Sequence, residues 1–361
     1  MKLSVPDYIL SIKPYAPGKP LEEVEREYGI HNSIKLASNE NPLGPSPLAL
    51  KAIQEGVENL NRYPDGSGHN LRHKIAEHLG LRPQNIVLGN GSDEIIGMLT
   101  STFMRPGDEA ILPHPSFLMY EIMVRSSGAI PMSVPLKELF IDLDGMMEQI
   151  NSRTRMIFLC NPNNPTGQVI SKQDFENFIK EIPSEIVVVV DEAYMEFVRD
   201  QNCARSIEYL DNTRPLVMLR TFSKAYGLAG LRIGYGAMME EIAGLINRVR
   251  QPFNANSLAQ DGAIAALEDT GFLEKVIALV HDGIDFLYDS LDRMRIKYIP
   301  TQTNFFLIDV EKDADEVFES MLRQGVIVRS MTSYGYPRYI RINAGLHEEN
   351  VRFIRALENV L

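Results

Sequence analysis

The sequence is short of cysteine and has no long apolar run. Two cysteines, Cys160 and Cys203, are too few for a disulfide framework or a structural zinc site, and they suit the reducing cytoplasm, where we expect the protein to work. No stretch approaches the ~20 consecutive apolar residues that a membrane helix needs. The first fifteen residues are interrupted by Pro6, Asp7 and Lys13, so we expect no signal peptide.

An excess of positive charge is also missing. Lys and Arg number 36 against 48 Asp and Glu, which gives a formal net charge of −12. A chain of this sign is a poor candidate for binding nucleic acid or an anionic membrane through its overall field. Of the seven histidines, His69 and His73 are four residues apart on a predicted helix, but no third ligand accompanies them. We therefore expect no metal site.

Strands and helices alternate along most of the 361 residues. Predicted strands cover 85–91, 109–117, 154–167, 185–194 and 216–224, and predicted helices cover 48–60, 69–80, 92–104 and 174–182, with more helix to about residue 250 and over 257–294. The run 186–190 is apolar without alternation, which is typical of a strand buried on both faces of a parallel sheet. The chain ends in strand 303–310, helix 314–325, strands 326–330 and 339–345, and helix 347–361.

This order predicts an α/β fold: a large, doubly wound, mostly parallel sheet domain with a smaller α+β domain built from the C-terminus and an N-terminal arm. We place the arm at residues 1–45, the large domain at 46–255 and the small domain at 256–361. The arm holds Pro-rich segments at 13–20 and 39–47 and a short predicted helix at 21–29.

Polar residues stand directly after each predicted strand of the large domain. They lie in the segments 89–94, 114–117, 161–167, 191–194 and 221–224, and Arg232 follows eight residues after Lys224. Ligands bind beyond the carboxyl ends of strands in such a sheet, so we expect these segments to share one site. The helix start after Gly91 could bind an anion through its free N–H groups. Taken singly, each feature also fits a helix cap, a turn or a solvated lysine.

Together the motifs resemble those of the pyridoxal-phosphate aminotransferases of fold type I, class I/II. Asn-Pro-Thr-Gly at 164–167, Asp-x-x-Tyr at 191–194, Ser-Lys at 223–224 and Arg232 follow one another in the order of that family. The spacings are 27 residues from Asn164 to Asp191, 33 to Lys224 and 8 to Arg232. Segments 13–20, 36–47, 62–66 and 339–345 resemble the histidinol-phosphate aminotransferases in particular. The resemblance covers essentially the whole chain.

The resemblance implies pyridoxal 5′-phosphate as cofactor and a role for each motif residue. Lys224 would bond covalently to the cofactor aldehyde and shuttle protons, and Asp191 would face the pyridine nitrogen. Asn164 and Tyr194 would donate to the phenolate oxygen. The cofactor phosphate would be held by Ser92, Asp93, Thr221, Ser223 and Arg232. Phe117 stands where the family commonly has tyrosine, which keeps the stacking of rings but loses the hydroxyl.

A homodimer with shared active sites is also implied. Tyr63 matches a tyrosine that reaches the cofactor phosphate of the other subunit. Arg341 matches the arginine that grips the substrate carboxylate, and in histidinol-phosphate enzymes the pair that matches Arg329 and Arg341 receives the substrate phosphate. Tyr15 matches a tyrosine that closes over the substrate, and Asn39 matches a position near the active site.

The implied reaction moves an amino group between L-histidinol phosphate and 2-oxoglutarate, which gives imidazole-acetol phosphate and L-glutamate in histidine biosynthesis. An aromatic amino-acid aminotransferase or a threonine-phosphate decarboxylase would use the same cofactor site, and the motifs around Lys224 do not separate these activities. The range of amine donors therefore stays open. A non-enzymatic regulator with this fold would carry a DNA-binding unit, but the 45 residues before the large domain are Pro-rich and hold no recognition helix.

Overall fold

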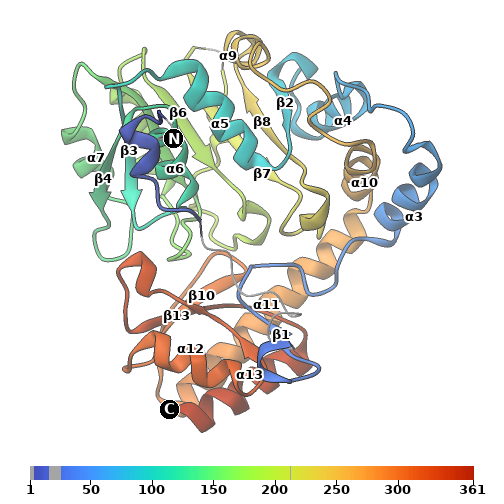
Figure 1. The fold of residues 1–361 in the computed structure, drawn as a ribbon, viewed down its shortest axis with the longest axis vertical. Coiled ribbons are helices and arrows are strands. Elements are labelled where there is room, and N and C mark those ends of the chain that lie inside the picture. Colours follow the sequence, from blue (N-terminus) through green and yellow to red (C-terminus); the bar gives the residue numbers. More distant parts are fainter. Residues whose placement is uncertain (1–3, 16–25, 212) are drawn as a thin grey trace.

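The computed structural model describes residues 4–15, 26–211 and 213–361. Figure 1 shows a large unit built around one sheet and a smaller unit below it, with the long helix α11 (Thr270–Met294) running between them. The predicted helix at 21–29 and the Pro-rich segment at 13–20 lie partly outside the described residues; of the former, 26–28 are helical.

Seven strands form the sheet of the large unit, in the order β2-β8-β7-β6-β5-β3-β4. β8 runs antiparallel to both of its neighbours, and the other adjacent pairs are parallel. The strands are β2 (Ile86–Gly89), β3 (Glu109–His114), β4 (Ile130–Pro135), β5 (Thr154–Cys160), β6 (Val187–Asp191), β7 (Leu216–Thr221) and β8 (Gly234–Met238). The predicted doubly wound, mostly parallel sheet is confirmed.

Helices cover both faces of this sheet. One face is covered by α5 (Ser92–Phe103), α6 (Met119–Ser126) and α9 (Glu240–Ile246). The other is covered by α7 (Leu143–Glu148) and α8 (Lys172–Glu181), and then by α3 (Pro47–Gly56), α4 (His69–Leu79) and α10 (Ser257–Glu268) over β2 and β8. In β6, Val187 and Val189 pack in the core on the side of α5, α6 and α9, and Val188 and Val190 pack in the core on the side of α7 and α8. The strand is therefore buried on both faces, as its unbroken apolar run predicts.

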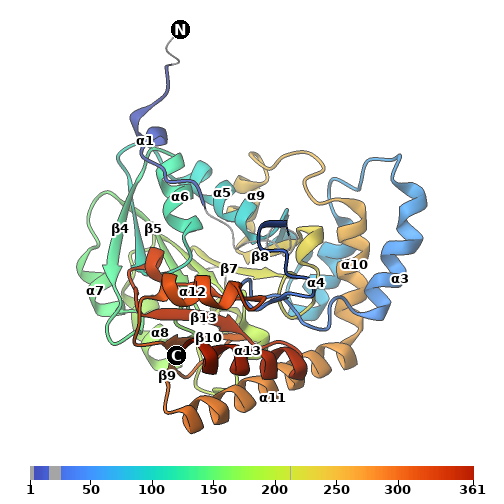
Figure 2. The same ribbon diagram turned by 60° about the horizontal axis from the view of Figure 1, so that its bottom comes forward.

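The smaller unit contains an antiparallel sheet in the order β12-β13-β10-β9. Its strands are β9 (Lys297–Ile299), β10 (Phe305–Asp309), β12 (Arg329–Ser330) and β13 (Tyr339–Asn343), and they pack with α11, α12 (Ala314–Leu322) and α13 (His347–Val360). The arm joins this unit where β1 (Ile34–Lys35) pairs with β11 (Val326–Ile327). Figure 2 shows α1 (Asp7–Leu10) beside α6 of the large unit, and α11 running below α13 toward α10.

The elements of the large unit that the sequence does not predict include the strands β8 and β4. The segment predicted as helix before residue 250 contains β8, whose glycines give no helical or strand pattern. A Cβ on Gly234 would lie 2.6 Å from the Ser92 nitrogen, so the start of α5 needs glycine here. β4 is an unpredicted edge strand that contains two prolines, which an edge tolerates. The region 257–294 is helical as predicted, and Asp269 divides it by ending α10 and capping α11.

The division into domains at residue 256 remains a prediction. Helix α10 follows that boundary in the chain, yet its buried alanines Ala259, Ala263 and Ala266 pack with Leu71 and Ile75 of α4 in the core of the large unit. The long helix α11 then contributes Val280, Ile284 and Leu287 to the core of the smaller unit.

Candidate active site

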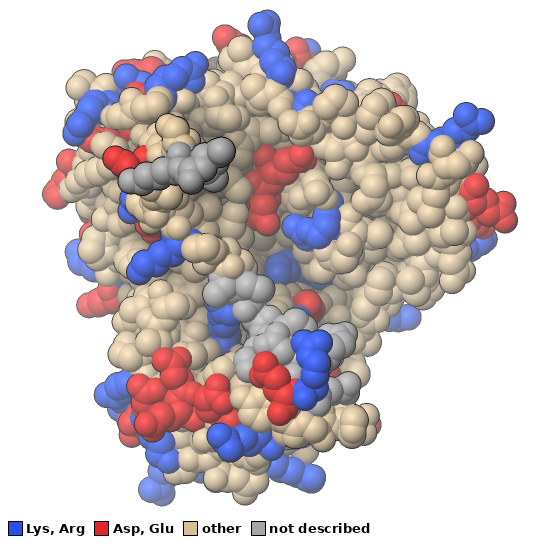
Figure 3. Space-filling model, in the orientation of Figure 1, with Lys and Arg blue, Asp and Glu red and all other residues tan. Residues whose placement is uncertain are grey.

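A cavity of about 340 Å³ lies where the carboxyl ends of the large sheet face the smaller unit. Figure 3 shows the depression between the two units, with Lys and Arg atoms inside it. Fourteen of the fifteen predicted site residues line the cavity: Tyr15, Asn39, Ser92, Asp93, Phe117, Asn164, Asp191, Tyr194, Thr221, Ser223, Lys224, Arg232, Arg329 and Arg341. Those that follow β5, β6 and β7 meet because these strands are parallel and end at the same edge.

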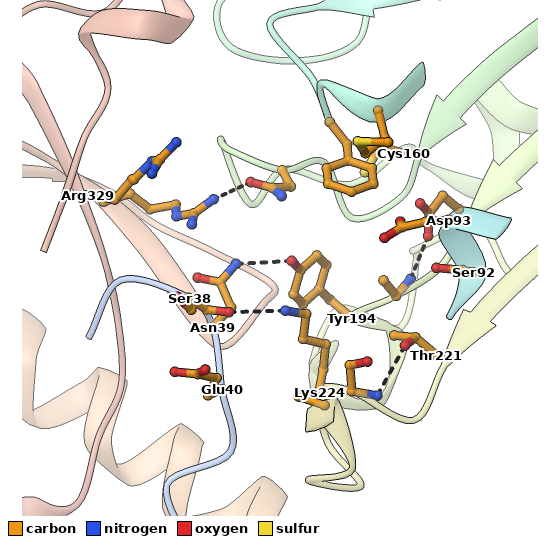
Figure 4. A pocket seen from close by; sticks show the side chains of 18 of the residues that line it. Ser38, Asn39, Glu40, Ser92, Asp93, Cys160, Tyr194, Thr221, Lys224 and Arg329 are labelled. Atoms are coloured by element: carbon orange, nitrogen blue, oxygen red, sulfur yellow. Dashed lines mark hydrogen bonds between the residues drawn. The ribbon is translucent and has the colours of Figure 1, made fainter. Parts of the chain in front are cut away.

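Lys224 follows β7 and extends its amine into this cavity (Figure 4). The Nζ donates a hydrogen bond to the carbonyl of Ser38 at 3.1 Å and lies 5.8 Å from the centroid of the Tyr194 ring. Burial above all, and then the nearby Arg341 cation, lower the pKa of Lys224 from 10.5 to about 8. An amine with this pKa is partly neutral near physiological pH and can act as a nucleophile or a proton acceptor.

Asp191 is the last residue of β6 and is buried. Its Oδ1 accepts a hydrogen bond from the Ala193 N–H at 3.2 Å, and its Oδ2 accepts one from the Tyr120 hydroxyl at 2.8 Å. Burial raises the pKa of Asp191 from 3.8 to about 6, while the Tyr120 bond opposes that change. A buried carboxylate at the wall of a cavity suits a ligand that presents a protonated ring nitrogen.

The start of α5 forms the opposite end of the site. The N-cap residue of α5 is Gly91, which has no side chain to cap the first turn. The Arg232 guanidinium packs against Gly91, where a Cβ would collide with it, and donates to the Ser223 hydroxyl at 3.3 Å. The Thr221 hydroxyl accepts from the Ser223 N–H at 3.1 Å. Free N–H groups, two hydroxyls and a cation here make an anion site of the kind that binds phosphate.

Two arginines form the wall that the smaller unit contributes. Arg329 on β12 and Arg341 on β13 are direct partners in the antiparallel register. Arg341 is buried, donates to the Ala37 carbonyl at 3.0 Å and to the Asn164 side chain, and lies 5.0 Å from the centroid of the Phe305 ring. Among the described residues its Nε has no partner. Two adjacent guanidinium groups suit a ligand with more than one negative charge.

The segment after β1 closes the site from the side of the arm (Figure 4). Asn39 has a φ of +56° and donates from its side chain to the Tyr194 hydroxyl at 3.0 Å. Its backbone N–H donates to the Asn343 side chain at 3.0 Å, and its carbonyl accepts from the Asn304 side chain at 3.1 Å. The smaller unit therefore fixes both Asn39 and the Ser38 carbonyl that Lys224 contacts.

Some residues of the site are not predicted from the sequence. They are the cavity-lining Ala37, Ser38, Glu40, Met119, Cys160, Ala193, Ala229 and Tyr334, and Tyr120 behind the wall. Tyr120 lies in the ordinary amphipathic pattern of α6, and only its position three residues after Phe117 could have drawn attention to it. Tyr63 does not line the cavity of its own chain. Its side chain is 83% exposed and stacks on Phe253 with the ring centroids 4.7 Å apart.

Comparison with known proteins identifies the family. Residues 31–357 match the model of the family described as "Aminotransferase class I and II". The chain belongs to the class I and II aminotransferases. This aminotransferase is 48% identical to the histidinol-phosphate aminotransferase of Caldicellulosiruptor saccharolyticus over 355 residues, which are 98% of this chain and 99% of that protein. It is 49% identical to histidinol-phosphate aminotransferase 2 of Carboxydothermus hydrogenoformans over 352 residues, 97% of each chain.

A solved structure shows the same fold. The histidinol-phosphate aminotransferase of Sinorhizobium meliloti, in complex with pyridoxal-5′-phosphate, superposes with a TM-score of 0.90 at 28% identity and covers 98% of this aminotransferase and 96% of that chain. The similarity of fold therefore extends over both units. Within the described ranges, the aminotransferase has no helix with the length and apolar character to cross a bilayer.

Proposed function

We propose that this aminotransferase transfers an amino group between L-histidinol phosphate and 2-oxoglutarate and works in histidine biosynthesis. The names of its relatives, which are 48–49% identical over nearly the full length, support this reaction. The observation that carries the proposal is the pairing of Arg329 with Arg341 at the wall of the cavity. A phosphate ester carries nearly two negative charges and three acceptor oxygens, so it matches two guanidinium groups, while a single carboxylate needs one.

Pyridoxal 5′-phosphate is the proposed cofactor, and the residues of the cavity fit it. The anion site at the start of α5, with Thr221, Ser223 and Arg232, suits its phosphate, and Ser92 and Asp93 belong to the same turn. Asp191 suits the ring nitrogen, and Asn164 and Tyr194 suit the ring oxygen. Phe117 lines the same cavity and offers a ring for stacking. When bound, this cofactor supplies an aldehyde for the amine and a ring that withdraws electrons from the substrate.

Each group of the chain that lines the cavity then has a separate role in the proposed reaction. The Lys224 amine would hold the cofactor through its aldehyde, and as a free amine it would accept and return a proton, for which a pKa of about 8 is well placed. Asp191 provides a fixed negative charge, and Tyr194, held by Asn39, provides a hydroxyl donor. Arg341 orients the carboxylate of glutamate, and Arg329 with Arg341 orients the phosphate of the other substrate. Tyr15, at the edge of the cavity, covers the bound substrate.

We propose a homodimer with shared sites, in which Tyr63 reaches the cofactor phosphate of the partner subunit. The exposed Tyr63–Phe253 stack supports this, and two apolar side chains shortly before Tyr63 in the sequence are exposed as well: Val57 is 48% exposed and Leu60 56%. We also propose that the enzyme works in the cytoplasm, since Cys160 and Cys203 are both free thiols.

An amine-donor panel tests the proposed reaction. L-histidinol phosphate, phenylalanine, tyrosine and threonine phosphate are each assayed with 2-oxoglutarate as acceptor. We expect kcat/KM for histidinol phosphate to exceed that of the aromatic amino acids by about 10- to 150-fold, the value of a hydrogen bond to a charged group. A preference for phenylalanine or tyrosine would favour the aromatic amino-acid reaction, and release of CO₂ from threonine phosphate would favour the decarboxylase.

A further inference from the structure

Tyr120 lies directly behind the cavity and contacts two residues that line it, Asp191 and Phe117. The residue is fully buried on α6, and its hydroxyl donates to Oδ2 of Asp191 at 2.8 Å. Its ring stacks on Phe158 with the centroids 4.9 Å apart and the planes inclined by 12°. Phe117 meets the same ring edge-on at 5.5 Å and 84°. These ring contacts fix the direction of the hydroxyl, so the bond to Asp191 is preorganised.

We propose that Tyr120 is a positioning residue that keeps the Asp191 carboxylate ionised and directed into the cavity. The inference rests on the proposed function, in which Asp191 faces the ring nitrogen of pyridoxal 5′-phosphate. It adds to that function the Tyr120 hydroxyl, which lies behind Asp191 and would set the charge of Asp191 without contacting the cofactor.

The surroundings of Asp191 explain why such a group is needed. Asp93 of α5 and Glu192, the residue that follows Asp191, are negatively charged. Both charges therefore disfavour the ionised form of Asp191. The Cys160 thiol and the Tyr194 phenol are neutral neighbours of Asp191, and each has its pKa raised by burial. Burial itself is the largest effect and also favours the protonated carboxyl. Against these stand two hydrogen-bond donors, the Tyr120 hydroxyl and the Ala193 N–H. Removing one of two donors from a buried carboxylate raises its pKa.

A purely structural role for Tyr120 makes a different prediction, and Tyr120→Phe separates the two. Phenylalanine keeps the ring contacts with Phe158 and Phe117 and removes only the hydroxyl. Tyr288→Phe is the matched control. Tyr288 also stacks on a neighbour, Tyr298, with centroids 4.2 Å apart, and its hydroxyl accepts a hydrogen bond from the Thr301 N–H in the smaller unit.

The first measurement is binding of pyridoxal 5′-phosphate by cofactor-free protein between pH 5 and 9. For Tyr120→Phe we expect about tenfold weaker binding at pH 7. We also expect the midpoint of the acid limb to move up by about one pH unit, because more of the Asp191 carboxyl is protonated. The ionisations of the cofactor are common to all variants and cancel in the comparison. An unchanged midpoint in Tyr120→Phe overturns the proposal, whatever the affinity, and Tyr288→Phe should leave both quantities unchanged.

The second measurement is urea unfolding of the cofactor-free variants as a function of pH. The folded pKa of Asp191 is above its unfolded value, so its contribution to stability falls as pH rises from about 4 through about 6. Tyr120→Phe extends this fall to higher pH. The gap, the difference between the urea midpoints of wild type and the variant, should therefore widen between pH 6 and 8. In an Asp191→Asn background the gap should not widen. A gap independent of pH overturns the proposal. If wild type binds no pyridoxal 5′-phosphate, the proposed cofactor fails, and this measurement still decides the role of Tyr120.

Discussion

At the scale of single residues, burial shifts the two central ionisable groups toward their neutral forms. Lys224 and Asp191 face one cavity, and removal from water disfavours the charge of each. The Lys224 pKa falls to about 8 and the Asp191 pKa rises to about 6, so both titrate near neutral pH. At pH 7 a carboxyl with a pKa of about 6 is still mostly ionised, as a fixed charge must be, while an amine with a pKa of about 8 is suited to proton transfer.

The lowered pKa of Lys224 predicts how fast the cofactor attaches. Only the neutral amine is a nucleophile, so the rate of covalent attachment of pyridoxal 5′-phosphate should rise with pH with a midpoint near 8. Stopped-flow growth of the visible absorption band on mixing with cofactor-free protein measures this rate. Borohydride reduction and peptide mapping should then place the pyridoxyl group on Lys224. A midpoint near 10.5, the ordinary value for lysine, or a label on another lysine, would contradict the assignment.

Arg329 should discriminate between the two substrates. Arg329→Ala should weaken transition-state binding of histidinol phosphate by about 1.5–3 kcal/mol and spare glutamate, which Arg341 holds alone. The comparison is kcat/KM for each donor in the variant and in wild type. Arg338→Ala is the matched control, because Arg338 directly precedes β13, the partner strand of β12, but pairs with Asp309 at the surface. Equal losses for both donors, or no loss for either, would rule out a two-arginine phosphate site.

At the scale of elements, the ends of strands were predictable and the packing between elements was not. The motifs after β5, β6 and β7 are contiguous in sequence, so parallel order alone brings Asn164, Asp191 and Lys224 together. β8 was not predicted because its glycines are required by the close approach of α5, which is distant from β8 in the sequence. Tyr120 was missed for the same reason, since its partner Asp191 is 71 residues away. The pairing of Arg329 with Arg341 could be anticipated because one short hairpin connects their strands.

A buried ion network joins the ends of β6 and β7 and should stabilise the fold. Arg220 pairs with Glu192 at 2.9 Å and with Glu196 at 2.9 Å, and all three side chains are largely buried. Arg220→Ala leaves two buried carboxylates without their cation, so we expect a loss of about 3–5 kcal/mol in the free energy of unfolding. Arg199→Ala removes an exposed pair with Asp285 and should cost less than about 1 kcal/mol. Urea unfolding at neutral pH gives both values, and equal losses would show that the network contributes no more than a surface pair.

At the scale of the whole molecule, the cavity draws on both units, and the proposed dimer adds a second chain. The smaller unit supplies Arg329, Arg341 and the contacts that fix Asn39, while the large unit supplies Lys224 and Asp191. Tyr63 belongs to neither wall and is exposed beside Phe253. If it completes the site of a partner, activity depends on assembly, and inactive chains can complement one another.

Subunit exchange tests that dependence. Lys224→Ala and Tyr63→Ala chains are purified separately, mixed in equal amounts and allowed to exchange, with two affinity tags to confirm mixed dimers. In a mixed dimer, one site combines the intact Lys224 of one chain with the intact Tyr63 of the other. Random exchange therefore restores about a quarter of all sites.

A second mixture controls for traces of wild-type enzyme and for exchange itself. Lys224→Ala and Asp191→Asn alter two residues that line the cavity of one chain, so no mixed dimer contains a site with both intact. This mixture should stay inactive. If the Lys224→Ala and Tyr63→Ala mixture also stays inactive although mixed dimers are recovered, Tyr63 serves its own chain. Recovery in that mixture alone establishes that each site is built from two chains, which would explain why so large an aromatic pair lies exposed on the isolated subunit.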